Sequence, residues 1–185
     1  PHEDSKFDRA LNILFSKYIE SISSLSPYVA KQIKTDFKGP VWAGFHPINT
    51  NLHPIINQQK ARTELKWNAG ASYVLFFGLI RKYKGLELLI SAFNETPLVE
   101  QNIMLYVAGE CYENQKKYIQ IVKSFNLEER VILDFKFKNT AEIQQLFSAS
   151  DIVAQTYHKA TQSGVTPLAY HYQKPLLVSD IEGLR

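Results

Sequence analysis

Two turns in this sequence carry residue types that suit a phosphate group. The first, residues 78–85, reads Gly-Leu-Ile-Arg-Lys-Tyr-Lys-Gly and lies between an apolar run and a helical pattern. Arg81 can donate two parallel hydrogen bonds to a phosphate, and Lys84 adds a positive charge just before the helix. Gly78 permits a tight turn, and the N–H groups at the start of the helix favour an anion. A solvated basic loop is the alternative interpretation.

The second turn, residues 161–165, reads Thr-Gln-Ser-Gly-Val. Gly164 lets the backbone approach a ligand closely, and the N–H groups of Gly164 and Val165 would point at an anion. Ser163 could cap the helix or bond a ligand oxygen, and a plain serine N-cap is the alternative. Because a diphosphate needs donors from two sides, the two turns together predict a diphosphate site.

Other chemistry is poorly supported by the sequence. It contains neither the G-x-G-x-x-G pattern of dinucleotide-binding proteins nor the G-x-x-x-x-G-K-[ST] pattern of P-loop proteins. His46, His158 and His171 show no ligand spacing to a cluster of Cys, Asp or Glu, so no bound metal is expected. Glu110 follows a third expected strand, where it could face the same crevice or serve as a charge at a helix N-terminus.

The two turns are positioned by alternating strands and helices after residue 72. Strands are expected at 73–77, 103–107, 131–135, 152–155 and 176–178, and helices at 86–93, 114–124, 140–147 and 164–172. This alternation predicts an α/β fold with a doubly wound, Rossmann-like parallel sheet. Ligands of such sheets bind beyond the carboxyl ends of the strands, where both turns lie.

The first 71 residues do not show this regular alternation of strands and helices. Helical spacing covers residues 4–20, an apolar piece follows at 22–25, and Ser26 and Pro27 read as the start of a helix that runs to about residue 35. A strand is expected at 41–45. Residues 48–71 are rich in Asn and Pro around a short helix pattern at 58–65, which suggests a linker between residues 1–47 and a domain at 72–185.

Composition narrows the class of protein. Hydrophobic residues make up 45% of the 185-residue chain and charged residues 21%, which is typical of a globular protein. The longest apolar run is shorter than the roughly 20 residues of a transmembrane helix. The single cysteine, Cys111, fits a reducing, cytoplasmic compartment. A net charge of +3 is too small and too evenly spread to indicate nucleic-acid binding. Lysines of the first helices form a solvated face or a peripheral contact with an anionic membrane.

Five sequence segments, in the order in which they occur along the chain, resemble the donor-binding half of retaining GT-B glycosyltransferases of the "glycosyl transferases group 1" family. They are Phe77–Gly85, Val107–Glu110, Ser148–Ile152, Ser163–Val165 and Lys174–Asp180. The resemblance is good over residues 72–185. It is weaker over 1–71, which look like the tail of the acceptor-binding domain. The chain is therefore expected to be the C-terminal half of a GT-B fold, truncated at both ends.

The resemblance implies a nucleotide-diphosphate sugar, such as a UDP- or GDP-sugar, as the donor substrate. It assigns the donor diphosphate to Arg81 and Lys84 in the first turn and to Ser163, Gly164 and Val165 in the second. Weaker donor-site candidates are Gly78, Glu110, Phe137 and Lys138, the last two near the base. It also implies that no metal or other cofactor is required, because protein cations stabilise the leaving diphosphate.

The chain departs from the family at two glutamates that many members carry, separated by seven residues. The first contacts the donor sugar and the second the ribose. Thr161 and Ala169 occupy these positions, and neither is a carboxylate. Sugar and ribose contacts would then come from Thr161, Gln162 or Tyr170, and Thr161 and Gln162 are the only catalytic candidates. Some members have a Thr-Gln-Ser-Gly turn, so the departure does not establish a loss of activity.

Three functions remain open from the sequence. The first is part of a glycosyltransferase that transfers a sugar, with retention, to a glycan or lipid-linked acceptor in surface polysaccharide biosynthesis. The second is a non-catalytic GT-B-like binding module, which the missing glutamates favour. The third is an unrelated α/β phosphosugar enzyme. Since GT-B chemistry takes place between two lobes, the chain alone is expected not to transfer sugar.

Overall fold

A computed structural model describes residues 11, 14–47, 51–95 and 101–184. The chain divides into two compact units, residues 1–47 and residues 48–185. The helix expected at 4–20 lies mostly outside the described residues, as does the Pro1-His2-Glu3 segment. Residues 48–71, expected to be a linker, belong to the second unit.

The first unit contains a helix and a two-stranded parallel sheet. Strand β1 (Ile22–Ser24) pairs with β2 (Val41–Ala43), and helix α2 (Pro27–Asp36) connects them. Ser26 caps α2 by accepting a hydrogen bond from the Val29 N–H, and Pro27 occupies the first turn as the sequence predicted. The strand expected at 41–45 ends at Ala43.

The second unit is built on a five-stranded parallel sheet with the order β5-β4-β3-β6-β7. Its strands are β3 (Ser72–Phe77), β4 (Ile103–Ala108), β5 (Val131–Asp134), β6 (Ile152–Gln155) and β7 (Leu176–Val178). From the central strand β3 the chain adds β4 and β5 on one side, then returns to place β6 and β7 on the other. This doubly wound topology confirms the fold class predicted from the sequence.

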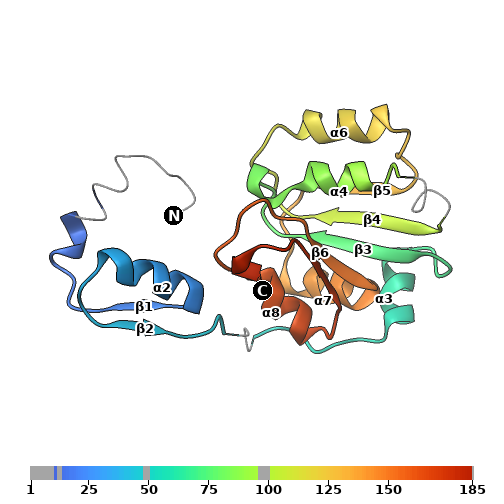
Figure 1. Cartoon of the computed structure of the whole chain (residues 1–185). Helices are drawn as coiled ribbons and strands as arrows, with labels where there is room; N and C mark the ends of the chain where they lie inside the picture. Colours follow the sequence, from blue (N-terminus) through green and yellow to red (C-terminus); the bar gives the residue numbers. More distant parts are fainter. Residues whose placement is uncertain (1–10, 12–13, 48–50, 96–100, 185) are drawn as a thin grey trace. The chain divides into compact units, whose positions relative to one another are not determined.

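Helices cover both faces of this sheet (Figure 1). Helices α4 (Leu86–Ala92) and α6 (Gln115–Ser124) cover one face, and α7 (Thr140–Ala149) and α8 (Val165–His171) cover the other. Strand β3 is buried on both sides because Phe76 packs into the α4–α6 core and Leu75 into the α7–α8 core. Two short 3₁₀ turns, η1 (Lys82–Lys84) and η2 (Glu182–Leu184), lie in the loops.

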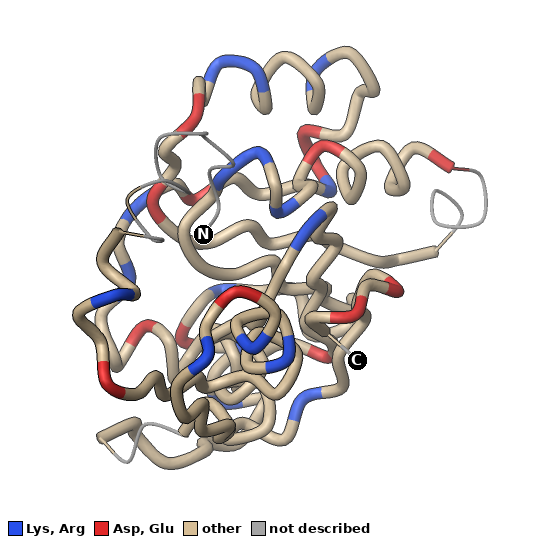
Figure 2. The backbone as a smooth tube through the Cα atoms, turned by 60° about the vertical axis from the view of Figure 1, so that its left-hand side comes forward, with Lys and Arg blue, Asp and Glu red and all other residues tan. Residues whose placement is uncertain are grey.

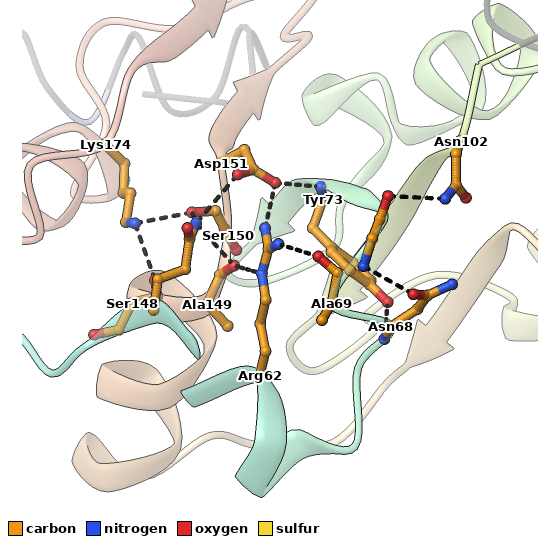
Figure 3. A network of polar contacts seen from close by, with 12 residues as sticks. Arg62, Asn68, Ala69, Tyr73, Asn102, Ser148, Ala149, Ser150, Asp151 and Lys174 are labelled. Atoms are coloured by element: carbon orange, nitrogen blue, oxygen red, sulfur yellow. Dashed lines mark hydrogen bonds and ion pairs between the residues drawn. The ribbon is translucent and has the colours of Figure 1, made fainter. Parts of the chain in front are cut away.

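A polar network fixes helix α3 (Gln58–Leu65) to the amino end of β6 (Figure 3). Arg62, buried in this network, forms an ion pair of 2.6 Å with Asp151, and its Nε donates to the carbonyl of Ala149. Asp151 also accepts the Tyr73 N–H at 2.6 Å, and the Lys174 ammonium donates to the carbonyls of Ser148 and Ser150. The Ser148–Ile152 segment therefore has a structural role. It lies at the amino ends of the strands, whereas the predicted ligand site lies at their carboxyl ends.

Charge is dispersed along the backbone. Figure 2 shows Lys and Arg positions interspersed with Asp and Glu positions. Among the described helices, none has the length and apolar character needed to cross a bilayer.

Candidate functional site

The candidate site lies where the chain changes direction in the sheet. Strands β3 and β6 are neighbours, and the connections that leave their carboxyl ends run to opposite sides. In doubly wound sheets, ligands bind beyond the carboxyl ends of the strands at such a switch point. Gly78 follows β3 and Thr156 follows β6, so the two predicted turns flank this point.

Gly78, Lys84 and Val165 converge at the switch point. Gly78 has a φ of +104°, in the region that favours glycine. A Cβ atom at this residue would lie 2.9 Å from the Lys84 Nζ and 3.5 Å from the Val165 Cγ2. The structure therefore brings the start of the first turn, its lysine and the start of α8 together, although they are distant in the sequence.

Lys84 is a buried cation with only 7% of its surface exposed. Burial, and then repulsion by Arg81, lower the pKa of Lys84 from 10.5 to about 8, so the side chain stays mostly protonated at neutral pH. In the described part of the chain, no carboxylate lies within ion-pair distance of its ammonium. A buried positive charge in this state favours an anionic ligand.

Tyr157, the second residue after β6, contacts both turns. The Lys84 ammonium lies 5.3 Å from the centroid of the Tyr157 ring, and the hydroxyl of Tyr157 lies 3.2 Å from the Ser163 Oγ. Burial raises the pKa of Tyr157 to about 12, although the bond to Ser163 lowers it, so the phenol remains protonated at neutral pH. Sequence reasoning missed this residue. The one signal in the sequence was its position two residues after an expected strand.

The first turn is fixed against the segment that follows β6. Gly85 adopts a φ of +64°, and a Cβ there would lie 2.1 Å from the carbonyl oxygen of Thr156. The Thr156 hydroxyl donates to the Gly85 carbonyl at 3.0 Å, and the His158 N–H donates to the Tyr83 carbonyl at 2.7 Å. These contacts hold the backbone that carries Lys84 in a defined place.

The second turn is partly satisfied by its own side chain. The Ser163 Oγ accepts a hydrogen bond of 3.2 Å from the Val165 N–H, although the N-cap of α8 is Gly164 and not Ser163. The Val165 N–H, predicted to face a phosphate, is therefore engaged by Ser163. Gly164 is exposed at the start of α8. A Cβ at Gly183 in η2 would lie 2.8 Å from the Thr161 Cα, so η2 packs closely on this turn.

Arg81 and Glu110 lie near the rim of the same sheet edge. Arg81 is exposed, and its guanidinium lies 5.2 Å from the centroid of the Tyr112 ring. The Ile80 N–H donates to the carbonyl of Glu110 at 2.8 Å, which extends the pairing of β3 and β4 beyond the strands. The Glu110 side chain is half-buried.

Phe137 and Lys138 follow β5 and differ in exposure. Phe137 is 69% exposed, so its ring is available to a planar ligand. Lys138 is buried, and its ammonium forms ion pairs with Asp134 and Glu142. Burial alone would raise the pKa of Asp134, but hydrogen bonds from Lys138 and Tyr106 lower it. The charge of Lys138 is thus already compensated by carboxylates of the chain.

The positions of the two missing glutamates lie in different surroundings. Ala169 is fully buried in the core beneath α8, beside Phe147 and Val153. Thr161 is half-buried on the second turn, while Gln162 next to it and Tyr170 on α8 are exposed. Thr161, Gln162 and Tyr170 therefore expose polar side-chain surface, whereas Ala169 exposes none.

Comparison with known proteins gives a family and a fold. The family model "Glycosyl transferases group 1" matches residues 57–185. HepE (Alr3699) of Anabaena, solved with UDP and glucose, is 21% identical with a TM-score of 0.81. Sucrose-phosphate synthase of Thermosynechococcus elongatus is 19% identical with a TM-score of 0.76. WaaG, a glycosyltransferase involved in lipopolysaccharide biosynthesis, is 16% identical with a TM-score of 0.69.

This chain spans about half the length of these structures. The similarity covers 98% of it and 50% of HepE, 100% of it and 48% of the synthase, and 87% of it and 44% of WaaG. At these identities the likeness establishes the α/β fold, of the Rossmann-like type found in GT-B proteins. No curated protein matches the chain in sequence.

Proposed function

Because the chain belongs to the Glycosyl transferases group 1 family, we propose that its second unit binds the diphosphate of a nucleotide sugar. In the full-length protein, the sugar is transferred with retention to a glycan or lipid-linked acceptor in surface polysaccharide biosynthesis. The complexes of HepE with UDP and glucose and with UDP-glucose support a uridine nucleotide as the first donor to test. The involvement of WaaG in lipopolysaccharide biosynthesis supports a surface glycan as the acceptor class.

The observation that carries this proposal is the buried ammonium of Lys84 at the switch point. Its lowered pKa of about 8 reports an environment that disfavours the charge in the absence of an anion. A diphosphate would supply the opposite charge and raise that pKa again. In the reaction, Lys84 and Arg81 would stabilise the negative charge that develops on the leaving diphosphate.

Calorimetric titration with UDP, GDP and UDP-glucose tests the donor site. The chain should bind at least one of them, and Arg81→Ala should weaken binding by about tenfold or more, since a charge-assisted hydrogen bond contributes about 1.5–3 kcal/mol. Lys123→Ala removes an exposed charge from α6 and serves as the control. The proposal fails if no nucleotide binds, or if Arg81→Ala and Lys123→Ala bind equally well.

A second candidate function is a non-catalytic binding module. Ala169 favours it, because this position, where many family members carry a glutamate, holds a buried methyl group and no carboxylate. Release of UDP from UDP-glucose by the full-length protein, in the presence of acceptor, would support the enzyme. Nucleotide binding without release would support the binding module. We also propose that the chain alone does not transfer sugar, because GT-B chemistry needs both lobes.

A further inference from the structure

Tyr157 is the one side chain at the switch point whose described contacts reach both turns. Its ring faces the Lys84 ammonium at 5.3 Å, and its hydroxyl lies 3.2 Å from the Ser163 Oγ. Only 3% of the residue is exposed, so the ring has little freedom to move. The Tyr83 ring meets it edge to face, with centroids 6.1 Å apart, which further fixes its plane.

The ring has an electrostatic effect on Lys84. The face of an aromatic ring is negative, and a cation within about 6 Å of the centroid is stabilised by it. In a buried site this contact favours the protonated amine, and therefore opposes the burial that lowers the pKa of Lys84. The ring keeps Lys84 charged for an incoming anion without pairing it with a carboxylate.

The hydroxyl has a separate effect on the second turn. The Ser163 Oγ accepts the Val165 N–H at 3.2 Å while it bonds the Tyr157 hydroxyl. The mutual bond between the two hydroxyl groups uses one of their two hydrogens, and the other can be donated to a phosphate oxygen. A turn anchored in this way presents its donor in a fixed direction, which lowers the entropy lost on binding.

We propose that Tyr157 is a positioning residue that couples the two turns, holding the Lys84 ammonium with its ring and Ser163 with its hydroxyl, so that both face one diphosphate. This inference rests on the proposed function. It goes further by assigning a role to a residue of a third segment. It also predicts that the two effects of Tyr157 can be separated by substitution.

Two variants separate the effects. Tyr157→Phe keeps the ring and loses the hydroxyl, so UDP should bind about 3- to 10-fold more weakly. Tyr157→Leu loses both, and UDP should bind about 10- to 100-fold more weakly. In a double-mutant cycle, Tyr157→Phe and Ser163→Ala should be non-additive because they remove the same bond. Tyr28→Phe, which removes a hydroxyl bonded to Gln32 in α2, is the matched control for folding and handling.

A pH titration gives a readout that a loss of packing alone would not move. The affinity of the wild type for UDP should fall as the pH rises through about 8, because the diphosphate binds protonated Lys84. The midpoint should move to lower pH in Tyr157→Leu and stay in place in Tyr157→Phe. Among the described residues, Arg81 is the charged group that acts on Lys84, and the phenols of Tyr157 and Tyr83 pack beside it. The His158 imidazole lies beside Gly85, so the titration is repeated with His158→Gln.

The outcomes distinguish this inference from the function on which it rests. If the wild type binds no nucleotide, the proposed function fails and the coupling role falls with it. If the wild type binds UDP and both Tyr157 variants bind it as tightly as the wild type does, only the coupling role is wrong. NMR titration of the Lys84 side chain without ligand independently checks whether the Tyr157 ring favours the charged amine. If the titration midpoint of Lys84 in folded Tyr157→Leu equals that of the wild type, the proposed electrostatic effect of the ring is wrong. Circular dichroism and thermal unfolding establish that each variant is folded.

Discussion

At the scale of single residues, the burial of Lys84 lowers the stability of the fold and would favour the anion binding proposed for it. Its pKa in the folded chain is about 8, below the ordinary 10.5, so the fold disfavours the charged amine. For such a group, the cost of the charge is fully present below about pH 8. It disappears between about pH 8 and 10.5, where the native chain loses its proton before the unfolded chain does. The site therefore holds a charge that lowers stability at neutral pH, as expected for a group kept for binding.

Lys84→Met should accordingly stabilise the chain and weaken nucleotide binding at the same time. At pH 7 we expect the free energy of unfolding to rise by about 1–3 kcal/mol, because an unpaired buried charge is replaced by an apolar chain of similar length. The gain should shrink as the pH rises from about 8 to 10.5. Urea unfolding at several pH values measures the first effect, and UDP titration measures the second. A variant less stable than the wild type at pH 7 would contradict this account.

Some of the proposed residue roles could be predicted from the sequence, and others could not. The roles proposed for Arg81 and Lys84 were readable because glycine, basic residues and a helix start occur together within eight positions. The role proposed for Tyr157 was not, since its partner Lys84 lies on a different segment and the two meet only because β3 and β6 are neighbours. The compensation of Lys138 by Asp134 and Glu142 was similarly hidden in side-chain geometry.

At the scale of elements, the close packing of Gly85 on Thr156 joins the loop after β3 to the loop after β6. Gly85→Ala would place a Cβ 2.1 Å from the Thr156 carbonyl oxygen at a φ of +64°, so one of the two loops must move. We expect a loss of at least about 2 kcal/mol in unfolding free energy and weaker UDP binding by the folded fraction.

Gly70→Ala is the matched control for this substitution. A Cβ at Gly70 would lie in ordinary van der Waals contact, 3.5 Å from the Asn68 Oδ1. Chemical denaturation compares the stabilities, and calorimetry compares the affinities of the two variants. If Gly85→Ala behaved like Gly70→Ala in both assays, the loops would not be coupled through this contact.

The network around Asp151 is a second contact between elements, and we expect it to contribute to stability rather than to binding. Asp151→Asn would leave buried Arg62 without its anionic partner and weaken the bond to the Tyr73 N–H. Removing one partner of a buried pair costs about 3–5 kcal/mol. Because Asp151 is 38% exposed, we expect about 2–3 kcal/mol by urea unfolding.

Nucleotide binding by folded Asp151→Asn should be unchanged, because the network lies at the opposite edge of the sheet from Gly78 and Lys84. Glu129→Gln, at an exposed carboxylate, should change stability by less than about 0.5 kcal/mol. Loss of UDP affinity in folded Asp151→Asn would show that the two edges communicate.

The positions of the strands and helices were the features most readily predicted from the sequence. The sequence indicated every strand of the second unit because each is a short apolar run with turn residues around it, and α8 was misplaced by only one residue at each end. The pairing of β1 with β2 was not anticipated, since a three-residue strand gives too short a pattern. The strand order also had to come from the structure, because alternation fixes parallel crossovers without fixing which strands are neighbours.

At the scale of the whole molecule, the candidate donor-site residues are unequally divided between the two units. All the candidate donor residues lie in the second unit, and so do the residues with which their described side-chain contacts are made, among them Tyr157, Thr156, Tyr112, Asp134 and Glu142. Both hydrophobic cores of that unit are also built from its own residues. Nucleotide binding should therefore be a property of residues 48–185.

A chain reduced to residues 48–185 should fold cooperatively and bind UDP within about twofold of the 185-residue chain, because no donor contact is removed. Thermal unfolding and calorimetry measure both properties side by side. Lys84→Met introduced into the shorter chain should abolish or strongly weaken that binding, which establishes that the same site is occupied. If the shorter chain were folded but bound UDP more than about tenfold more weakly, the first unit would contribute directly to the donor site, at about 1.4 kcal/mol or more.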